Sequence, residues 1–389
     1  MTALQGTAVA VVVTGLPVRW LRRLLSRASV RSVWSGSPII TMALNARAER
    51  LLGCNATSVV THTYFITEEF DRDLSRWQRV PVVRTALPFA LFVWACWFAD
   101  RLHFYCDRGM LPSRERLTFN FLELRVYRLL GIDVFLWTYG ADVRSRDLTR
   151  ALGEPNCCSE CTQVGIACIC DGELRRRNAR ELARLTRAVF AMGDMIEYVP
   201  GSNNSLFFWP VDLAADGGRK YRAALPIFNG PRTVRIVHAP NHRMFKGTRF
   251  LEQAVAELER EGEPVELVLV ERVPNRKAVE IYRSADIIFD QCLTGFHGYF
   301  ALEGMALGKP VMCFIRKPAE YLLHPEECPI INTHPATLKE DIRRLVRDPA
   351  QLTAAGEQGR RYVEKYFTLE AFAGRLDQVY RELGVAPCR

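Results

Sequence analysis

The sequence predicts an α/β protein made of two doubly wound domains in series. The chain has 389 residues, and a single hydrophobic core stops growing near ~250–300 residues, so two domains are expected. In both halves, short apolar or β-branched runs alternate with segments of helical spacing, which indicates parallel sheets with helices on their faces. Gly, Pro and Asn are concentrated toward 212–230, which marks a linker between the halves.

The expected elements follow from these runs in chain order. In the first half the strands are 31–34, 57–65, 102–105 and 134–138, and the helices are 39–52, 117–130 and 173–189. In the second half the strands are 234–238, 265–270, 286–290 and 310–314, and the helices are 249–261, 277–284 and 299–307. Sheets of this kind bind ligands at the carboxyl ends of their strands, so candidate site residues are sought there.

Composition narrows the class of protein and the class of partner. Hydrophobic residues make up 49% of the chain and charged residues 24%, which excludes a wholly disordered protein. The 52 Lys and Arg outnumber the 43 Asp and Glu, for a net charge of +9. Positive charge favours anionic partners, such as nucleotide diphosphates, acidic polysaccharide, anionic lipid or nucleic acid, without choosing among them.

Two apolar segments bear on membranes. The segment 87–98 is 12 residues long, shorter than the ~18–20 residues that a spanning helix needs. It suits either a buried core helix or an interfacial helix in contact with a membrane. The apolar start, 1–20, has no basic residue before its apolar run and so lacks the layout of a secretory signal. We therefore expect a cytoplasmic protein, with peripheral contact at the inner face of a membrane as the alternative.

The segment 286–311 has the pattern of a strand, a glycine loop and a helix. The strand ends near Asp290, the loop contains Gly295 and Gly298, and the helix begins at Tyr299. Glycines let the backbone approach a ligand, and a helix N-terminus favours an anion such as a nucleotide diphosphate. Glu303 lies one turn into the helix, where a carboxylate can accept hydrogen bonds from two ribose hydroxyls. The alternative is an ordinary turn with a surface Glu.

A basic loop follows the strand at 234–238. Arg243 and Lys246 are three residues apart and precede Gly247. Both cations could reach one phosphate group, because Arg offers a planar fork and Lys a point charge. The alternative is a solvated basic loop.

These two stretches resemble the C-terminal domain of the retaining GT-B glycosyltransferases of family 4. In that family a basic Arg…Lys-Gly loop binds the donor diphosphate, and a Glu followed by M-A-x-G-x-P-V binds the ribose. The segment 303–311, EGMALGKPV, matches this pattern. The family has a second Glu eight residues earlier that contacts the transferred sugar, and this chain has Gly295 there. His297 and Tyr299 are nearby groups that could replace that contact.

The resemblance implies the GT-B architecture, in which two Rossmann-like doubly wound domains face a cleft. We expect an N-terminal, acceptor-side domain over 1–211 and a linker at 212–230. The nucleotide-sugar-binding domain is expected over 231–365. The tail, 366–389, resembles a closing helix that crosses back to the first domain.

The activity implied by the resemblance is retaining transfer of a hexose-type sugar from a nucleotide-diphosphate sugar to a glycan, lipid-linked or polymer acceptor, with no cofactor required for catalysis. The residues that the resemblance and the glycine loops assign to donor binding are Gly36, Arg243, Lys246, Gly247, Gly295, His297, Gly298, Tyr299 and Glu303. The alternatives are a nucleotide-sugar epimerase on the same fold and a non-enzymatic, zinc-stabilised binding protein. Nucleic acid is not an expected partner, because basic and aromatic residues do not interleave as stacking platforms require.

The first half resembles the family more loosely. The segment 100–103, DRLH, resembles the strand end that carries a histidine at the cleft in this family, and His103 with Glu303 gives the expected catalytic pair. The turn 139–144, YGADVR, resembles a turn of the family. The alternatives are a hydrogen-bonded core histidine and, for Asp142 and Arg144, a structural ion pair.

Cysteines are clustered in one short segment. Five of the 12 cysteines lie in 157–170, and four of them, Cys158, Cys161, Cys168 and Cys170, have spacings that could close around structural Zn²⁺. Redox-active thiols and disulfides are the alternatives for this cluster. The other seven cysteines are expected to be small buried side chains.

Overall fold

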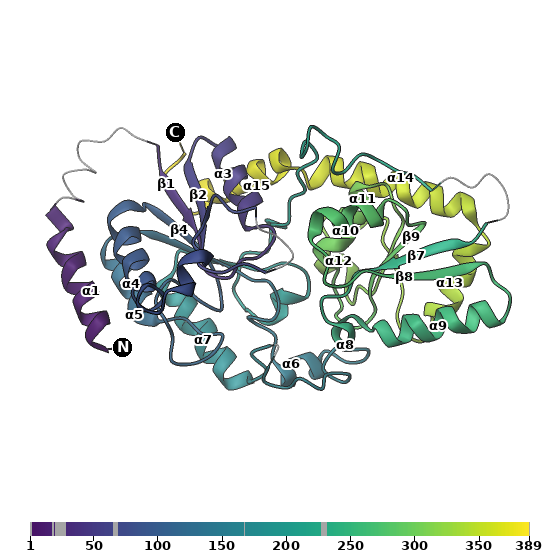
Figure 1. Cartoon of the computed structure of the whole chain (residues 1–389), viewed down its shortest axis with the longest axis horizontal. Coiled ribbons are helices and arrows are strands. Elements are labelled where there is room, and N and C mark those ends of the chain that lie inside the picture. The colour runs from purple at the N-terminus through teal and green to yellow at the C-terminus, as the bar shows by residue number, and fades with distance from the viewer. Residues whose placement is uncertain are drawn as a thin grey trace. The chain divides into compact units, whose positions relative to one another are not determined.

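The computed structural model describes residues 2–17, 19, 29–64, 69–166, 168–226 and 232–388. It contains two compact units, each with one parallel sheet (Figure 1). Unit 1 comprises Met1–Ser145, Gly165–Phe208 and Phe372–Arg389, and unit 2 comprises Arg146–Val164 and Trp209–Ala371. The predicted fold class, α/β with two Rossmann-like domains, is confirmed.

Unit 1 is built on a six-stranded sheet of order β3-β2-β1-β4-β5-β6. Its strands are β1 (Arg31–Trp34), β2 (Asn55–Val60), β3 (Arg72–Asp73), β4 (Arg101–Tyr105), β5 (Asp133–Trp137) and β6 (Ala188–Phe190). All five pairings are parallel. The strand order reverses between β1 and β4, and such a switch point is where doubly wound sheets bind ligands.

The helices of unit 1 cover this sheet. They are α1 (Thr2–Thr14), α3 (Met42–Leu51), η1 (Ser75–Arg79), α4 (Pro81–Phe98), α5 (Phe121–Leu129), α7 (Gly172–Leu185), η2 (Gly193–Glu197) and α15 (Leu369–Glu382), of which the part from Phe372 onward belongs to unit 1. Side chains cap two of them at the expected polar residues. Asn120 accepts the amide of Leu122 before α5, and Asp171 accepts the amides of Glu173 and Leu174 before α7.

Unit 2 is built on a five-stranded sheet of order β11-β10-β9-β7-β8. Its strands are β7 (Val234–His238), β8 (Val265–Leu269), β9 (Ile287–Gln291), β10 (Val311–Cys313) and β11 (Ile331–Asn332). Its helices are α6 (Arg146–Ala151), α8 (Arg243–Lys246), α9 (Thr248–Arg260), α10 (Asn275–Tyr282), α11 (Tyr299–Ala306), α12 (Pro318–Tyr321), α13 (Leu338–Val346) and α14 (Pro349–Tyr366). The amphipathic helices α9 and α13 bury their apolar stripes in one core with the sheet.

The division between the units differs from the predicted boundary at 211. Arg146–Val164 belongs to unit 2 and Phe372–Arg389 to unit 1. Cys157 packs into the core of unit 2, and Arg316 donates hydrogen bonds to the carbonyls of Leu152 and Pro155. These contacts link residues more than 150 positions apart, so no local pattern could have indicated them.

The apolar segment 87–98 is part of a longer and more exposed helix than the sequence suggested. Helix α4 has 18 residues, and only 22% of its apolar window is buried. Within 87–98 only Ala90 and Trp97 are exposed, and the exposed surface is concentrated toward the start of the helix, so neither the core nor the interfacial interpretation is excluded. By length and composition alone it could cross a membrane, and it is the one helix in the described ranges that meets this criterion.

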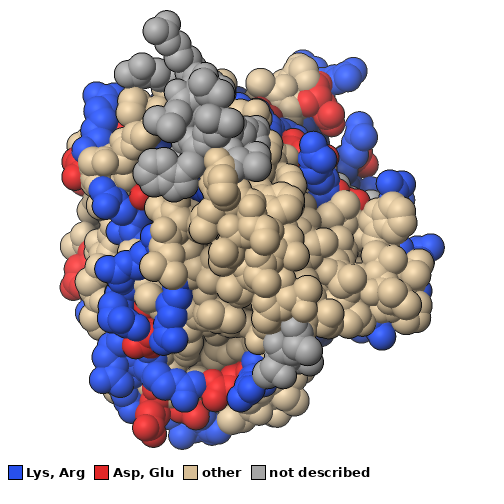
Figure 2. All heavy atoms as spheres, turned by 90° about the vertical axis from the view of Figure 1, so that its left-hand side faces the viewer, with Lys and Arg blue, Asp and Glu red and all other residues tan. Residues whose placement is uncertain are grey.

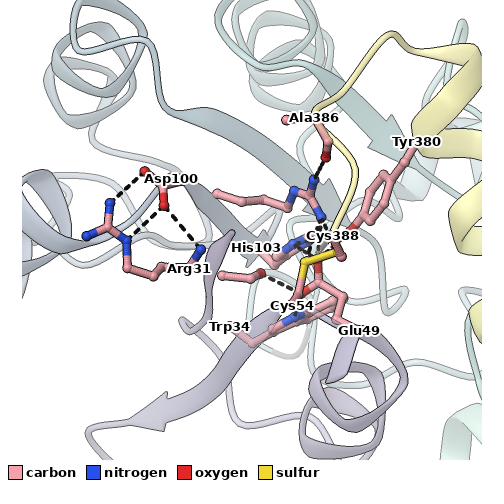
Figure 3. Close-up of a disulfide and its surroundings, with 11 residues drawn as sticks. Arg31, Trp34, Glu49, Cys54, Asp100, His103, Tyr380, Ala386 and Cys388 are labelled. Carbon is pink, nitrogen blue, oxygen red and sulfur yellow. Dashed lines mark hydrogen bonds and ion pairs between the residues drawn. A yellow bond between two sulfur atoms is a disulfide. The ribbon is translucent and has the colours of Figure 1, made fainter. Parts of the chain in front are cut away.

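Two scattered cysteines are joined rather than reduced. Cys54, before β2, forms a disulfide with Cys388 in the C-terminal tail, 334 residues away (Figure 3). For this pair the expectation of isolated, buried thiols is wrong. The disulfide ties the segment after α15 to the edge of α3 within unit 1.

Candidate functional site

The carboxyl edge of the unit 2 sheet gathers most of the predicted donor residues. Asp290, near the end of β9, is buried, and its Oδ1 lies 2.6 Å from Lys246 Nζ. Its other oxygen accepts the amide of Gly298, the residue before α11. Asp290 therefore fixes the ammonium of Lys246 and the start of α11 at one point of the sheet edge.

The backbone after Lys246 requires glycine. Gly247 has φ +73°, and a side chain there would place its Cβ 2.4 Å from Cys292 Sγ. This close approach lets α8 turn directly into α9 and brings Lys246 against the end of β9. The predicted basic loop is thus a short helical turn, and Gly247 acts through the backbone.

The pKa of Asp290 reports on this arrangement. Burial by itself raises the pKa, but the Lys246 charge, the Gly298 amide and the hydrogen bond from Lys246 outweigh it, and the pKa lies below its ordinary value. Asp290 is therefore ionised at neutral pH. A Lys ammonium has three N–H donors, so Lys246 keeps donors for a second anion while one holds Asp290.

Glu303 lies on α11 and is 3% exposed. Its Oε1 accepts hydrogen bonds from the Tyr221 hydroxyl at 2.9 Å and from Asn275 Nδ2 at 2.7 Å. Burial raises the pKa of Glu303, and the two hydrogen bonds partly offset that rise. Both bonds go to Oε1, and no residue in the described ranges hydrogen-bonds Oε2. The carboxylate is held in place with one oxygen left for a ligand hydroxyl.

Arg243 and Lys246 bind different carboxylates, Lys246 that of Asp290 and Arg243 those of Glu271 and Glu252. Its Nε and Nη2 bind the two oxygens of Glu271 at 2.9 and 2.7 Å, and Nη1 binds Glu252 at 2.9 Å. The hydrogen bond with Glu271 raises the pKa of Arg243. Exposed pairs of this kind contribute about 0–1 kcal/mol, so a phosphate could displace them at little cost. Of the two predicted cations, Lys246 is the one already held at the sheet edge.

Gly295, which stands where the family that the sequence resembles has a second Glu, is required by the loop. It has φ +93°, a conformation that side chains rarely adopt, and its Cβ position lies 3.2 Å from Arg316 Nε. The Gly295 carbonyl accepts the Arg316 amide at 2.9 Å. A Glu at this position would be strained, so the departure from the family pattern is built into the backbone.

His297 and Tyr299 are held by the protein itself. His297 is 4% exposed, and burial lowers its pKa to about 4, so its ring is neutral at pH 7. The Tyr299 hydroxyl donates to the Pro210 carbonyl at 3.1 Å. Both side chains are therefore held by contacts within the protein. Their roles as substitutes for the Glu of the family that the sequence resembles stay predictions.

His103 does not fit the catalytic role expected from the sequence. It is 0% exposed and stacks on Trp34, with ring centroids 3.9 Å apart. Trp137 Nε1 lies 3.1 Å from His103 Nδ1. An indole N–H can only donate, so Nδ1 accepts and the ring proton sits on Nε2. His103 is a hydrogen-bonded core histidine, which was the alternative interpretation.

The partner of His103 is a buried carboxylate that the sequence did not single out. Glu49 on α3 lies 3.4 Å from His103 Nε2 and 2.8 Å from Arg101 Nη1. Its Oε1 also accepts the Tyr380 hydroxyl at 2.8 Å (Figure 3). Arg101 in turn donates to the Ala386 carbonyl at 2.8 Å. This network fastens α15 and the C-terminal tail onto the sheet of unit 1.

The charges of this network can be assigned. Burial raises the pKa of Glu49, but His103, Arg101 and Ser32 outweigh it and keep the carboxylate ionised. Burial lowers the pKa of His103, so the imidazole is neutral and the permanent charge pair is Glu49 with Arg101. The network joins α3, β4 and α15 within unit 1.

Two buried aspartates, Asp107 and Asp142, lie after neighbouring strands of the unit 1 sheet. Asp107 follows β4 and accepts the Ser37 hydroxyl at 2.5 Å. Asp142 follows β5, and its Oδ1 accepts the amides of Tyr139 and Gly140 at 3.0 and 2.8 Å. Asp107 Oδ1 and Asp142 Oδ2 are buried and have no hydrogen-bond partner in the part of the chain described. Sequence reasoning missed Asp107, although its place after a predicted strand was a usable signal.

The other predictions for unit 1 have mixed outcomes. Arg144 forms a two-pronged ion pair with Asp194, at 2.8 and 2.7 Å, rather than with Asp142. Gly36 lies against the Arg108 carbonyl, 2.9 Å from the position of an added Cβ, and its role toward a donor phosphate stays a prediction.

The zinc hypothesis stays a prediction. Cys158 and Cys161 belong to unit 2, whereas Cys168 and Cys170 belong to unit 1. Within the described ranges, the groups of three ligand atoms within 4.8 Å are Glu49 with Cys54 and Cys388, and His324 with Glu326 and Glu327.

Asp142 leads to a testable pH dependence. Burial and the nearby Asp107 raise the pKa of Asp142 from 3.8 to about 7. Because the pKa of Asp142 is higher in the folded protein than in the unfolded chain, protonated Asp142 favours the folded state. This contribution to stability is fully present below the pKa of the unfolded chain and is lost as the pH rises through the pKa of the folded protein. Asp142→Asn keeps an acceptor for the two amides and removes the charge. We expect it to raise the free energy of unfolding by about 1–2 kcal/mol at alkaline pH and by less at acidic pH.

Thermal unfolding at about pH 5 and about pH 8 measures this difference. Asp73→Asn, at an exposed carboxylate of the same unit, is the control. Equal effects of Asp142→Asn at both pH values would contradict the assignment.

Solved structures that align with this chain have the fold of the GT-B glycosyltransferases. Sucrose-phosphate synthase from Thermosynechococcus elongatus aligns with a TM-score of 0.60 and 16% identity, over 91% of this chain and 99% of that chain. Anabaena HepE in complex with UDP-glucose aligns with a TM-score of 0.55 and 11% identity, over 90% and 99%. WaaG, a glycosyltransferase involved in lipopolysaccharide biosynthesis, aligns with a TM-score of 0.51 and 11% identity, over 90% and 99%.

At these low identities, the structural alignments establish the fold alone. No protein-family model and no curated protein matches the sequence.

Proposed function

We propose that the protein is a retaining glycosyltransferase, which transfers a hexose-type sugar from a nucleotide-diphosphate sugar to a glycan, lipid-linked or polymer acceptor. The observation that carries the proposal is Glu303, buried on α11 with Oε1 fixed by Tyr221 and Asn275. Its remaining oxygen is suited to the vicinal hydroxyls of a ribose. The complex of HepE with UDP-glucose, which has the same fold, is consistent with a nucleotide-sugar donor.

In this proposal Lys246 supports the departing diphosphate. When the sugar–phosphate bond breaks, negative charge grows on the phosphate oxygens. An ammonium already positioned by Asp290 stabilises that charge more in the transition state than in the ground state, and this difference is a source of rate. The N-terminus of α11 adds a favourable dipole. The chemistry proposed here uses residues of the chain alone.

The test is turnover of a panel of nucleotide sugars by the full-length protein. We expect one of them to release its nucleoside diphosphate, faster when a suitable acceptor is present, and to the same extent with a chelator. A product whose anomeric configuration equals that of the donor, read by NMR, supports retention. Conversion of the donor to an epimer without acceptor would instead identify an epimerase. No consumption of any donor would contradict the proposal.

A further inference from the structure

Exposed apolar side chains of unit 1 gather on three neighbouring elements. Of the 13 large apolar residues that are exposed in the described ranges, seven lie on α1, η1 and α4 or between them. They are Leu4 (43% exposed), Val11 (38%), Val13 (56%), Trp77 (44%), Val80 (46%), Val82 (79%) and Trp97 (41%). These seven residues define what we name the α1–α4 face. Apolar patches of this kind mark interaction sites on soluble domains.

The α1–α4 face belongs to the folded unit. Gly15, at the end of α1, lies so close to the Trp97 indole that an added Cβ would be 2.2 Å from its Nε1. Arg19 Nη1 donates to the carbonyls of Cys96 and Ala99 at 2.5 and 3.0 Å. Helix α1 is thereby fixed alongside α4 at the margin of the unit (Figure 1). The opposite side of α4 is anchored in the core through Phe92, which is 0% exposed.

The charged side chains within the segments that form the α1–α4 face are arginines. The segment 74–99 contains three arginines and no acidic residue, and the segment 2–17 contains no charged residue. Arg76, Arg79 and Arg84 are exposed. Figure 2 shows a broad surface without charged side chains, bordered on one side mainly by Lys and Arg with some Asp and Glu among them. An apolar face with a basic border and exposed Trp side chains matches the headgroup region of an anionic bilayer.

The dimensions favour a helix that lies on the membrane. Helix α4 has 18 residues, which at 1.5 Å per residue corresponds to about 27 Å, slightly less than a hydrocarbon core of about 30 Å. Arg84 lies within the first turn of α4, and the inner side of the helix packs on the rest of unit 1. We propose that the α1–α4 face docks unit 1 on an anionic lipid bilayer, with its apolar side chains between the lipids and Arg76, Arg79 and Arg84 at the phosphates.

The docking does not depend on sugar transfer. If unit 1 docks on a membrane, the sugar acceptor would be a lipid-linked molecule at the membrane surface. Only this consequence rests on the proposed function. Nucleotide binding by unit 2 is a separate readout, so failure of docking and failure of the proposed function can be distinguished.

The experiment is sedimentation of the full-length protein with vesicles of phosphatidylcholine, with or without phosphatidylglycerol. We expect binding to the anionic vesicles, and a loss of at least about tenfold in partitioning for the double variant Val13→Glu/Val82→Glu. The matched control is Leu129→Glu/Ile166→Glu, two exposed apolar residues, 86% and 61% exposed, outside the face. This control should bind as the unmodified protein does.

A second pair of variants tests the basic border. Arg76→Glu/Arg79→Glu should remove the preference for phosphatidylglycerol, whereas Arg125→Glu/Arg180→Glu, with the same change of charge at exposed sites elsewhere on unit 1, should keep most of it. Far-ultraviolet circular dichroism checks that each variant is folded. Absence of binding to anionic vesicles would overturn the proposal, as would unchanged binding of Val13→Glu/Val82→Glu. If the unmodified protein does not bind vesicles and is a dimer in light scattering, and Val13→Glu/Val82→Glu is a monomer, a second copy of the chain covers the α1–α4 face and the proposal is overturned.

Discussion

Glu303→Ala is expected to weaken binding of the donor nucleotide by about 100-fold while the protein stays folded. Hydrogen bonds to a charged group contribute about 1.5–3 kcal/mol each, and a ribose offers two hydroxyls, so a loss near 3 kcal/mol is expected. Burial raises the pKa of Glu303, and the hydrogen bonds from Asn275 and Tyr221 partly offset that rise. The removal of Glu303 leaves only the hydrogen bonds of Tyr221 and Asn275 unmade.

Calorimetric titration of the nucleoside diphosphate measures this effect, beside thermal unfolding of the same samples. Glu370→Ala, at an exposed Glu of unit 2, is the control and should bind as tightly as the unmodified protein. Glu303→Gln keeps an oxygen for Tyr221 and should fall between the two. An unchanged dissociation constant for Glu303→Ala would remove Glu303 from the site.

Lys246→Ala is expected to lower the free energy of unfolding of unit 2 by about 3 kcal/mol, because it leaves the buried carboxylate of Asp290 without its cation. The same change should weaken diphosphate binding. Lys339→Ala, which breaks a surface ion pair with Glu257 and Glu261, is the control and should cost less than about 1 kcal/mol. Denaturant unfolding measures the stability of both variants, and calorimetric titration measures their affinity for the diphosphate.

The double variant Lys246→Ala/Asp290→Asn separates the two roles of Lys246. An Asn still accepts the Gly298 amide and carries no charge, so stability should return to near that of the unmodified protein. Diphosphate affinity should stay low, since the cation is absent. Recovery of binding along with stability would mean that Lys246 has a structural role only.

The sequence predicted what depends on local pattern. The order of strand, glycine loop and helix around Glu303 was visible because the strand 286–290, Gly298 and the start of the helix at Tyr299 adjoin in the chain. The alternation of apolar and helical runs was enough for two parallel sheets. The helix α4 was underestimated, because Arg84 and Thr85 interrupt its apolar run without interrupting the helix.

What the sequence could not predict are pairings between distant residues. Lys246 and Asp290 are 44 residues apart, and Tyr380 and Glu49 are 331 residues apart. A histidine at a strand end has the same sequence pattern whether it faces solvent or the core. His103 is buried because Trp34 and Glu49 come from other elements to cover it. The disulfide of Cys54 was missed for the same reason.

The central claim is that unit 2 binds a nucleoside diphosphate through Glu303 and Lys246. A thermal-shift screen of the full-length protein against UDP, GDP, ADP and CMP, without added metal, tests it most directly. A ligand at ~100 times its dissociation constant should stabilise the folded protein by about 2.7 kcal/mol. We predict a clear shift with one diphosphate, retained in Glu370→Ala and lost in Glu303→Ala. No shift with any nucleotide, or a shift that Glu303→Ala leaves intact, would contradict the account.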